Sequence, residues 1–589
     1  VVVADLASSI AGSMWVLLVA VLLVMALTLT LVFAGRPRLL PLAVALAAAA
    51  LTFGVLSLVG ASLTMASIAV LPVLVGLAVD YAIQLQSRVE EEGAGLGAAA
   101  AARRAALLGA PTVAVAAAAT AAGFAALALS PVPMVRGFGL LLVAGIAIAF
   151  ACALLAGTAA LVLAERAALP PALRRAGGGV ARAVGATRAR ARGSGPARRV
   201  RAAGDAALAR AIANPARVLA LALVLAATGW ALDTQTRVES DIQKLVPQDL
   251  GALRDLDALQ RSTGVGGEVD VLIEGADLTR PAVLNWMIGY QTGVLKRVDY
   301  SAARGCGTAE LCPAFSLPDL FTTPASRRDA GGIRGLLDAV PPYFSQSVVS
   351  ADRRTATLAF GIRLMELDRQ KDVIDEMRAR LQRGRPAGVR ARLAGLPVLA
   401  ADANAEVASN GRRMLTLLAG LLAVAVVLLL ALRGIARALM PLVPIALATG
   451  WSALVLFALR IPLNPMSVTL GALVIAISTE FSVLLSERYR QERALGHDPH
   501  AALRRTYRST GAAVLASGAT AIAGFAVLVV SDIRMLRDFG FVTVVDLTVS
   551  LLGVLLVLPA VLLLAERRAK AQPAPPAPRA EPASSEALA

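Results

Sequence analysis

The sequence predicts a polytopic α-helical membrane protein, with two parallel repeats of transmembrane helices and an α+β, ferredoxin-like domain outside the membrane. Three observations predict this class: an apolar composition, two series of long apolar runs that align with each other, and one long polar segment. Apolar residues make up 57% of the 589 residues, and the mean hydropathy is +0.70. A soluble protein of this size is far less apolar, so several membrane spans are expected.

Eleven runs are apolar and long enough to cross about 30 Å of hydrocarbon. Five lie before a basic stretch and six lie after it, at residues 15–34, 39–59, 67–86, 110–130, 137–164, 218–232, 414–432, 439–459, 467–486, 511–530 and 540–565. The chain therefore divides into six parts. These are a first bundle (1–166), an Arg-rich linker (167–216), a single span (217–233), a polar domain (234–412), a second bundle (413–566) and a Pro/Ala-rich tail (567–589) expected to be disordered.

The arginines of the short loops predict the sidedness. Most of them fall on one side, for example Arg36, Arg88, Arg488 and Arg505. Cytoplasmic loops carry this excess of positive charge, so the C-terminus is expected in the cytoplasm and segment 234–412 outside, in a protein of the inner membrane.

The net charge of +17 has the same explanation. The stretch 165–216 holds eleven arginines without interleaved aromatic residues, which is typical of an anchor beside anionic lipid headgroups. Nucleic acid is therefore not an expected partner, and membrane lipids are.

The two series of runs align at an almost constant offset. Asp80 precedes Glu480 by 400 residues, and Gly123 precedes Gly524 by 401. Both series start on the same side, which predicts parallel repeats related by an axis along the membrane normal. The second repeat opens with a span and a polar domain that have no counterpart before Val1. We therefore expect about 190 further residues and twelve spans in the intact protein.

Asp80 and Glu480 are the leading candidates for functional residues. Each lies inside an otherwise apolar run, where a carboxylate costs about 2.5 to 3.5 kcal/mol on insertion scales. Burial disfavours the charged form of a carboxyl, so such a group can take a proton from one side and release it to the other. The alternative is an interhelical hydrogen bond that only holds the two halves together.

Three further polar residues lie near these carboxyls or at their depth. Ser478 and Thr479 can form hydrogen bonds near Glu480, and Asp546 is a third carboxyl, in the last span. The repeat counterpart of Asp546 is Gly145. Asp546 is compatible with a place in a proton relay and equally with a polar niche between helices.

The polar segment 234–412 mixes strand and helix patterns. Strands are expected at 269–273, 355–362 and 389–393, and helices at 281–295 and 373–381; this alternation is typical of an α+β sandwich of the ferredoxin-like kind. Cys306 and Cys312 lie in a loop of this segment, and outside the membrane they are expected to form a disulfide. Two free thiols are the alternative.

Two motifs resemble the fourth and tenth spans of resistance–nodulation–division (RND) exporters. They are Gly-Leu-Ala-Val-Asp-Tyr at 76–81 and Ile-Ser-Thr-Glu-Phe at 477–481. The closest branch is the MmpL-like, hydrophobe/amphiphile efflux type. The resemblance implies proton-driven export of hydrophobic or amphiphilic molecules, often lipids, with an Asp-Tyr relay in each half. Tyr81 matches the relay tyrosine, whereas Phe481 replaces it in the second half and has no hydroxyl.

Two other functions stay open from the sequence: a Patched-like lipid-sensing receptor, and a non-transporting scaffold for envelope-lipid synthesis. No nucleophile elbow, phosphate loop or cysteine-histidine cluster is visible in the sequence, so an enzyme, a cofactor and a metal site are not expected. His497 and His500 have no further ligand residues of that kind nearby. A homo-oligomer or a periplasmic partner is compatible with the sequence.

Overall fold

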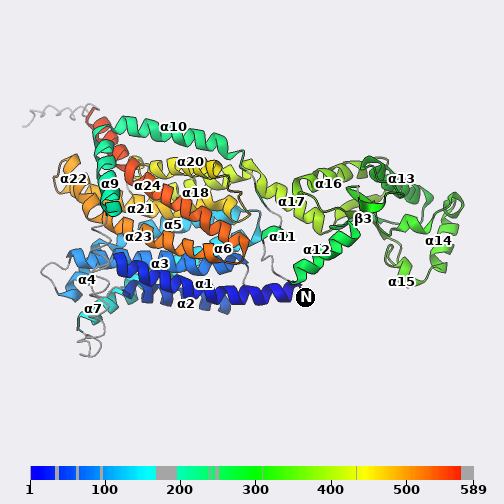
Figure 1. Cartoon of the computed structure of the whole chain (residues 1–589), viewed down its shortest axis with the longest axis horizontal. Helices are drawn as coiled ribbons and strands as arrows, with labels where there is room; N and C mark the ends of the chain where they lie inside the picture. The colour runs from blue at the N-terminus through cyan, green and yellow to red at the C-terminus, as the bar shows by residue number, and fades with distance from the viewer. Residues whose placement is uncertain are drawn as a thin grey trace, which may run out of the picture.

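The computed structural model describes residues 2–32, 39–60, 65–92, 97–166, 195–236, 238–239, 242–245, 251–307, 309–432 and 434–571. It has a bundle of long helices with a smaller α/β domain at one end (Figure 1). We call this the domain end of the bundle. The short helices α4 (Ala98–Leu108), α7 (Thr158–Arg166) and α22 (Pro499–Arg508) lie at the opposite end.

The first half of the bundle consists of the long helices α1 (Val2–Val32), α2 (Leu40–Leu58), α3 (Met65–Glu92), α5 (Ala110–Ala125) and α6 (Pro133–Cys152). A 3-10 turn, η1 (Ala126–Leu129), ends α5, and a π-helical turn, η2 (Ala153–Gly157), joins α6 to α7. Helix α1 begins well before the predicted span at residue 15.

The second half has a similar order of long helices. It contains α18 (Asn410–Ala431), α19 (Ile435–Leu439), α20 (Leu442–Leu459), η6 (Ser467–Thr469), α21 (Leu470–Ala494), α22, α23 (Thr510–Ala526), η7 (Val527–Val530) and α24 (Arg534–Ala571). Here too a short helix, α22, precedes a span that ends in a 3-10 turn. The helix α10 (Pro215–Asp233) packs against α20.

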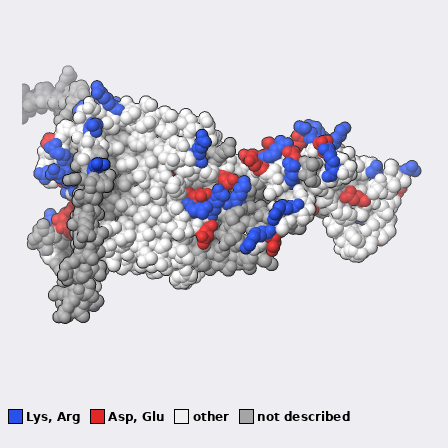
Figure 2. Space-filling model, viewed as in Figure 1, with Lys and Arg blue, Asp and Glu red and all other residues white. Residues whose placement is uncertain are grey.

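Nine helices of the described residues are long and apolar enough to cross a membrane. Two predicted spans fall outside this set. The span predicted at 15–34 is a shorter apolar stretch, Trp15–Leu31, within α1. The span predicted at 467–486 lies largely in α21, which carries Glu480 and ends in charged residues. Figure 2 shows that the visible flank of the bundle is nearly free of charge, with Lys, Arg, Asp and Glu gathered toward its two ends. This belt fits a multi-pass membrane protein.

The α/β domain has a four-stranded antiparallel sheet. Its strands are β1 (Gly267–Gly275), β2 (Leu311–Pro313), β3 (Thr355–Ile362) and β4 (Val389–Ala394), in the order β2-β3-β1-β4. Helix α13 (Pro281–Arg297) follows β1, and α16 (Leu367–Leu381) follows β3. This is the split β-α-β order of a ferredoxin-like fold, as the sequence predicts, although β2 was not predicted.

Alternating side chains of the strands and one face of each helix build the core of the domain. Val269, Val271 and Ile273 of β1 are fully buried, as are Leu358 and Phe360 of β3. The insertion between β2 and β3 carries η4 (Leu317–Leu320), η5 (Pro324–Arg327), α14 (Ala330–Ala339) and α15 (Pro342–Ser345). The structure joins Cys306, in η3 (Gly305–Gly307), to Cys312 of β2 in a disulfide with their Cα atoms 5.3 Å apart.

Four connections complete the molecule. Helices α11 (Ile242–Leu245) and α12 (Gly251–Thr263) lead from α10 into the domain, and α17 (Leu396–Ala408) leads back to α18. Residues 195–213 of the predicted Arg-rich linker (167–216) form a helix, α9 (Gly195–Ala213). Residues 167–194 and the predicted disordered tail after 571 lie outside the described residues.

The two halves interlock around α3 and α21. Helix α5 of the first half packs on α21, and α23 of the second half packs on α3. The Thr120 hydroxyl of α5 donates to the Ala476 carbonyl oxygen of α21 at 3.0 Å. Helix α3 is the most enclosed of the nine helices. In its most apolar stretch 94% of the residues are buried, compared with 22% in α10. Asp80 and Glu480 are therefore held in the middle of the molecule.

Candidate functional site

The carboxyls of Asp80 and Glu480 are fully buried, with 0% of either residue exposed. Asp80 lies about halfway along α3 and Glu480 about halfway along α21. The apolar stretches around them form helices because a backbone in hydrocarbon must satisfy its own hydrogen bonds. The structure thus brings the two repeat-related carboxyls to the contact between the halves.

Gln84 links the two carboxyls. Its amide nitrogen Nε2 donates to Asp80 Oδ1 at 2.9 Å and to Glu480 Oε1 at 2.5 Å. Gln84 lies one helical turn after Asp80 on α3, so both side chains project from the same face. These two carboxyl oxygens, which share one donor nitrogen, can be no more than 5.4 Å apart.

Two hydroxyls complete the site. The Ser517 hydroxyl of α23 donates to Asp80 Oδ1. Tyr81 is fully buried and its ring packs edge-on against Phe150. The Tyr81 hydroxyl lies near Glu480 and Thr120 but makes no hydrogen bond of normal geometry. Adjacent helical residues point in different directions, so the side chains of Asp80 and Tyr81 lie against different neighbours.

Several buried oxygens at this site lack a partner. Asp80 Oδ2, Glu480 Oε2 and Gln84 Oε1 have no hydrogen bond among the described residues, and neither does the Tyr81 hydroxyl. An unsatisfied buried polar atom costs about 1–3 kcal/mol. Protons on the carboxyls would turn acceptors into donors for these oxygens, and such a cluster can bind and release protons.

Ser478 and Thr479, the two predicted supporting residues, form hydrogen bonds to groups other than the two carboxyls. Ser478 accepts a hydrogen bond from the Ser550 hydroxyl at 2.5 Å, and Thr479 donates to the Ile475 carbonyl of its own helix at 2.6 Å. Both bonds lie next to Glu480 in the chain, but no hydrogen bond among the described residues joins either hydroxyl to the Glu480 carboxyl. A supporting role for the two residues stays a prediction.

Asp546 is buried on α24, 4% exposed, with Oδ1 unpartnered among the described residues. It lies near Ser452 of α20, and no hydrogen bond of the described residues joins it to Asp80 or Glu480. A place for Asp546 in a proton relay therefore stays a prediction beside the polar niche.

Sequence reasoning missed Gln84 and Ser517. Gln84 had a usable signal, because an amide four residues after a membrane carboxylate lies on the same helix face. Ser517 had none, since it reaches Asp80 from a helix 437 residues further along the chain.

The described residues contain no group of three or more His, Cys, Asp or Glu side chains that could hold a metal ion. His497 lies 3.5 Å from Glu492, a pair too small for such a site. The polar cluster at Asp80 and Glu480 is therefore the strongest candidate site in the described part of the chain.

The comparison with protein families agrees with this architecture. The family model of the MMPL family matches residues 1–194 and 322–581, which is more than half of the chain. The chain belongs to the MMPL family. The RND-type resemblance of the two carboxyl motifs is consistent with this membership.

Relatives cover parts of this MMPL chain. A Streptomyces coelicolor protein, SCO0839, whose name describes a membrane protein, is 31% identical over 251 residues, 42% of this chain and 35% of that protein. The Mycobacterium tuberculosis protein MmpL12, named as a transport protein, is 30% identical over 155 residues, 26% of this chain and 13% of that protein. The matches thus span well under half the length of these relatives.

The fold is also similar to a solved structure. The crystal structure of SecDF in its super-membrane-facing form aligns with a TM-score of 0.54 and 16% identity, over 96% of this chain and 63% of that chain. At this identity the likeness concerns the fold alone.

Proposed function

We propose that this chain is part of a membrane transporter of RND type that uses the proton gradient to export hydrophobic or amphiphilic molecules, lipids among them. The observation that carries the proposal is the buried cluster in which Gln84 joins Asp80 to Glu480. Membership in the MMPL family supports a transporter, and the fold shared with SecDF supports an architecture of two helical halves.

Electrostatic repulsion between the two carboxyls can couple their protonation to movement of the two halves. Two negative charges about 5 Å apart repel by a few kcal/mol even at an effective dielectric of about 20. Adding a proton removes this repulsion and changes which atoms donate and which accept. Because the carboxyls come from different halves, each change in protonation alters the contact between the halves.

The proposal extends to the layout of the protein. The two halves are parallel repeats of a twelve-span protein, and the α/β domain and the domain end face the outside, with the C-terminus in the cytoplasm. Similar order of elements in the halves supports the repeat, and the arginines of the short loops support the sidedness. Substrate leaves through the α/β domain.

The first prediction tests the carboxyls. Asp80→Asn and Glu480→Gln keep the size of each side chain but cannot exchange a proton, so we expect transport to fall to background in both. Folding should persist, because a neutral side chain avoids the desolvation cost of a buried charge. The measurement is efflux of a fluorescent hydrophobic probe from cells or vesicles under an imposed pH gradient.

Asp532→Asn is the matched control, since Asp532 is an exposed carboxyl at the domain end; it should transport normally. Asp546→Asn tells whether the third carboxyl belongs to the relay. Full gradient-driven transport in both Asp80→Asn and Glu480→Gln would leave the two carboxyls as a structural contact, and would favour the scaffold function.

A further inference from the structure

Four charged side chains join the two halves at the end of the bundle opposite to the α/β domain. Arg88 and Glu91 lie in the last turns of α3, and Arg488 and Glu492 lie near the end of α21. Arg88 forms an ion pair of 3.1 Å with Glu91, and Arg488 forms one of 3.1 Å with Glu492. Arg488 also lies 3.6 Å from Glu91, so it reaches across to the other half. We call these four side chains the charge lock.

The charge lock contains the one ion pair that crosses between the halves among the described residues. Glu91 uses the same oxygen, Oε2, for Arg88 of its own helix and for Arg488 of the other half. The Glu492 side chain is 6% exposed, and its Oε2 atom makes no hydrogen bond in the described part of the chain. His497 lies 3.5 Å from that oxygen. The crossing pair therefore belongs to a network that is largely shielded from solvent on its α21 side.

The charge lock continues the helix faces that carry the carboxyl cluster. On α3, Asp80, Arg88 and Glu91 lie at spacings of eight and three residues, which places them along one face of the helix. On α21, Glu480 and Arg488 are also eight residues apart. Eight residues are about 12 Å along a helix. The lock therefore lies on the line from the two carboxyls to this end of the bundle.

One helical turn separates the lock from the carboxyl cluster. Gln84 occupies this turn on α3, and its repeat counterpart, 400 residues later, is Leu484 on α21. Leu484 is buried, with 8% of the residue exposed. A leucine side chain cannot bind or pass a proton, so water must reach the carboxyls from this end before a proton can leave there.

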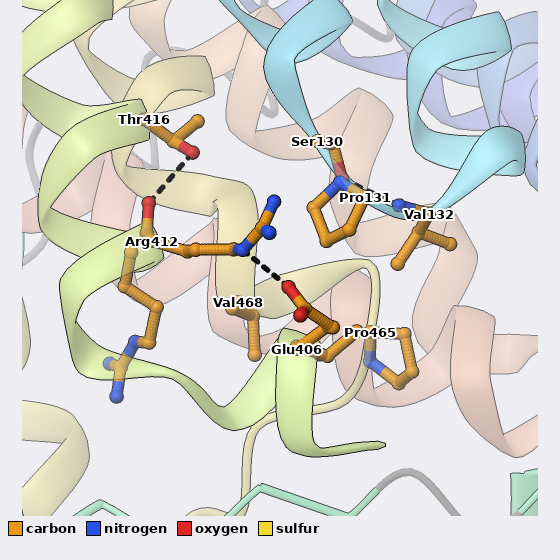
Figure 3. Close-up of a pocket in the computed structure, with 10 residues that line it drawn as sticks. Ser130, Pro131, Val132, Glu406, Arg412, Thr416, Pro465 and Val468 are labelled. Carbon is orange, nitrogen blue, oxygen red and sulfur yellow. Dashed lines mark hydrogen bonds and ion pairs between the residues drawn. The ribbon is translucent and has the colours of Figure 1, made fainter. Parts of the chain in front are cut away.

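The contact between the halves is built differently at the domain end. Figure 3 shows a hollow there, lined by residues 130–132 of the first half and by Pro465 and Val468 of the second. Its ion pair, Arg412 with Glu406, joins the consecutive helices α18 and α17. In the described ranges no ion pair joins the halves at this end, so charge closes the contact only at the opposite end.

We propose that the charge lock is a gate for protons, which closes the route between the carboxyl cluster and the cytoplasm and opens when the halves move apart. The inference rests on the proposed function and concerns the control of the same carboxyls. A partly exposed ion pair contributes little net stability, so the pair between Arg488 and Glu91 can break in every transport cycle. Arg88 and Glu492 keep the two partners in position, because each forms a shorter ion pair within its own helix.

The repeat allows only one crossing pair of this kind. Arg88 and Arg488 are repeat counterparts, but the counterpart of Glu91 is Gln491, which has no charge. The reverse pair, from Arg88 to the second half, therefore cannot form at that position. The lock depends on the Glu91 carboxylate, and removal of that one charge should open it.

A cysteine placed between the lock and the carboxyls reports whether this end is open. Leu484→Cys is made in the full chain together with Cys152→Ala, which removes the free thiol of the described residues. Inside-out membrane vesicles that contain this protein receive a membrane-impermeant maleimide from the cytoplasmic side. We expect Glu91→Gln to raise the labelling rate about fivefold, the factor that corresponds to loss of a partly exposed ion pair.

Glu92→Gln is the matched control. Glu92 is the next residue of α3, but it pairs with Arg104 of α4, at 2.7 Å, within the same half. Labelling should therefore stay at the starting rate in this variant. Arg488→Gln should raise the rate as Glu91→Gln does, whereas Arg488→Lys keeps the charge and should keep labelling slow. An unchanged rate in Glu91→Gln, or an equal rise in Glu92→Gln, would overturn the proposal.

Hydrogen exchange gives a second readout that needs no engineered cysteine. Peptides that cover residues 484–492 of α21 are compared between Glu91→Gln and Glu92→Gln in the full chain. We expect faster exchange only in Glu91→Gln, because only that change removes a contact of α21 with the other half. Identical exchange in the two variants would count against the lock.

Gradient-driven efflux in the same variants separates this inference from the proposed function. Glu91→Gln should lower efflux, because an open gate lets protons pass without substrate. Labelling that depends on Glu91 in a protein without proton-driven transport would refute the proposed function, while the closure at Glu91 would stand. Proton-driven transport with labelling that does not depend on Glu91 would refute the lock alone.

Discussion

At the residue scale, the two carboxyls are repeat counterparts with different neighbours. Glu480 has the Tyr81 hydroxyl nearby, whereas the equivalent position in the other half is Phe481, which is buried and has no hydroxyl. Asp80 instead accepts a hydrogen bond from Ser517. The two halves therefore place unequal groups around their carboxyls, so the proton relay that we propose is not a symmetric one.

Gln84 provides the sharpest prediction at this scale. Gln84→Leu removes the only donor that contacts both carboxyls among the described residues, so we expect a loss of about 1–3 kcal/mol of stability and a shift in the pH dependence of transport. The measurements are the thermal unfolding midpoint of the purified protein and gradient-driven efflux across a pH series.

Gln86→Leu is its matched control. Gln86 is as deeply buried on the same helix, but its bond goes to Glu90 within α3, at 3.1 Å. A pH profile that moves equally in both variants would show that Gln84 acts only through the packing of α3.

Sequence reasoning found Asp80 and Glu480 because a carboxylate in an apolar run is conspicuous whatever its partners. It could not find Ser517, because a single serine in an Ala-rich span has no distinguishing pattern until the helices are packed. Asp546 was found for the same reason as Asp80, but it lies near Ser452 of α20 and not beside Glu480. Composition identifies a costly residue, and only the tertiary structure tells which of them meet.

At the element scale, two repeat-related glycines allow the halves to interlock. A Cβ atom added at Gly123 of α5 would lie 2.7 Å from Ala476 Cβ and 2.9 Å from Ala476 Cα, on α21. One added at Gly524 of α23 would lie 3.5 Å from Gly76 Cα, on α3. Both crossings occur beside the helices that carry the carboxyls, so the close approach sets the geometry of the site.

Gly123→Ala tests this crossing. The new methyl must push α5 away from the backbone of α21, and overpacking of this kind costs about 1–3 kcal/mol. We expect a lower thermal midpoint and weaker gradient-driven transport. Gly137→Ala, on α6, is the control, since a Cβ atom there meets no heavy atom within 4 Å. Equal midpoints for the two variants would mean that the crossing tolerates a wider spacing.

Element prediction succeeded where a periodic pattern was long. Helices α13 and α16 and strands β1, β3 and β4 lie where the sequence placed them. Strand β2 has only three residues, too few for a pattern. Helix α9 lies in the predicted linker, for which no secondary structure was predicted, although alanine and arginine both favour helix.

At the scale of the whole molecule, an apolar belt separates two differently built ends. The domain end carries the α/β domain, and the opposite end carries short helices and ion pairs between long helices. There Arg493 pairs with Glu566 at 2.6 Å, which ties α21 to α24. A multi-pass membrane protein takes one orientation in the membrane, and the excess of arginine at one end predicts which one.

The disulfide offers a test of that orientation. Cys306 and Cys312 are joined in the α/β domain, and Cys152 is half-buried in α6. If the domain lies outside, a membrane-impermeant maleimide should label intact cells only after an impermeant reductant. Cys312→Ser should label without reductant, because Cys306 is partly exposed. The double variant Cys306→Ser/Cys312→Ser gives the background from Cys152. Labelling of the wild type that appears only in permeabilised cells would place the domain in the cytoplasm, and the proposed direction of export would then be wrong.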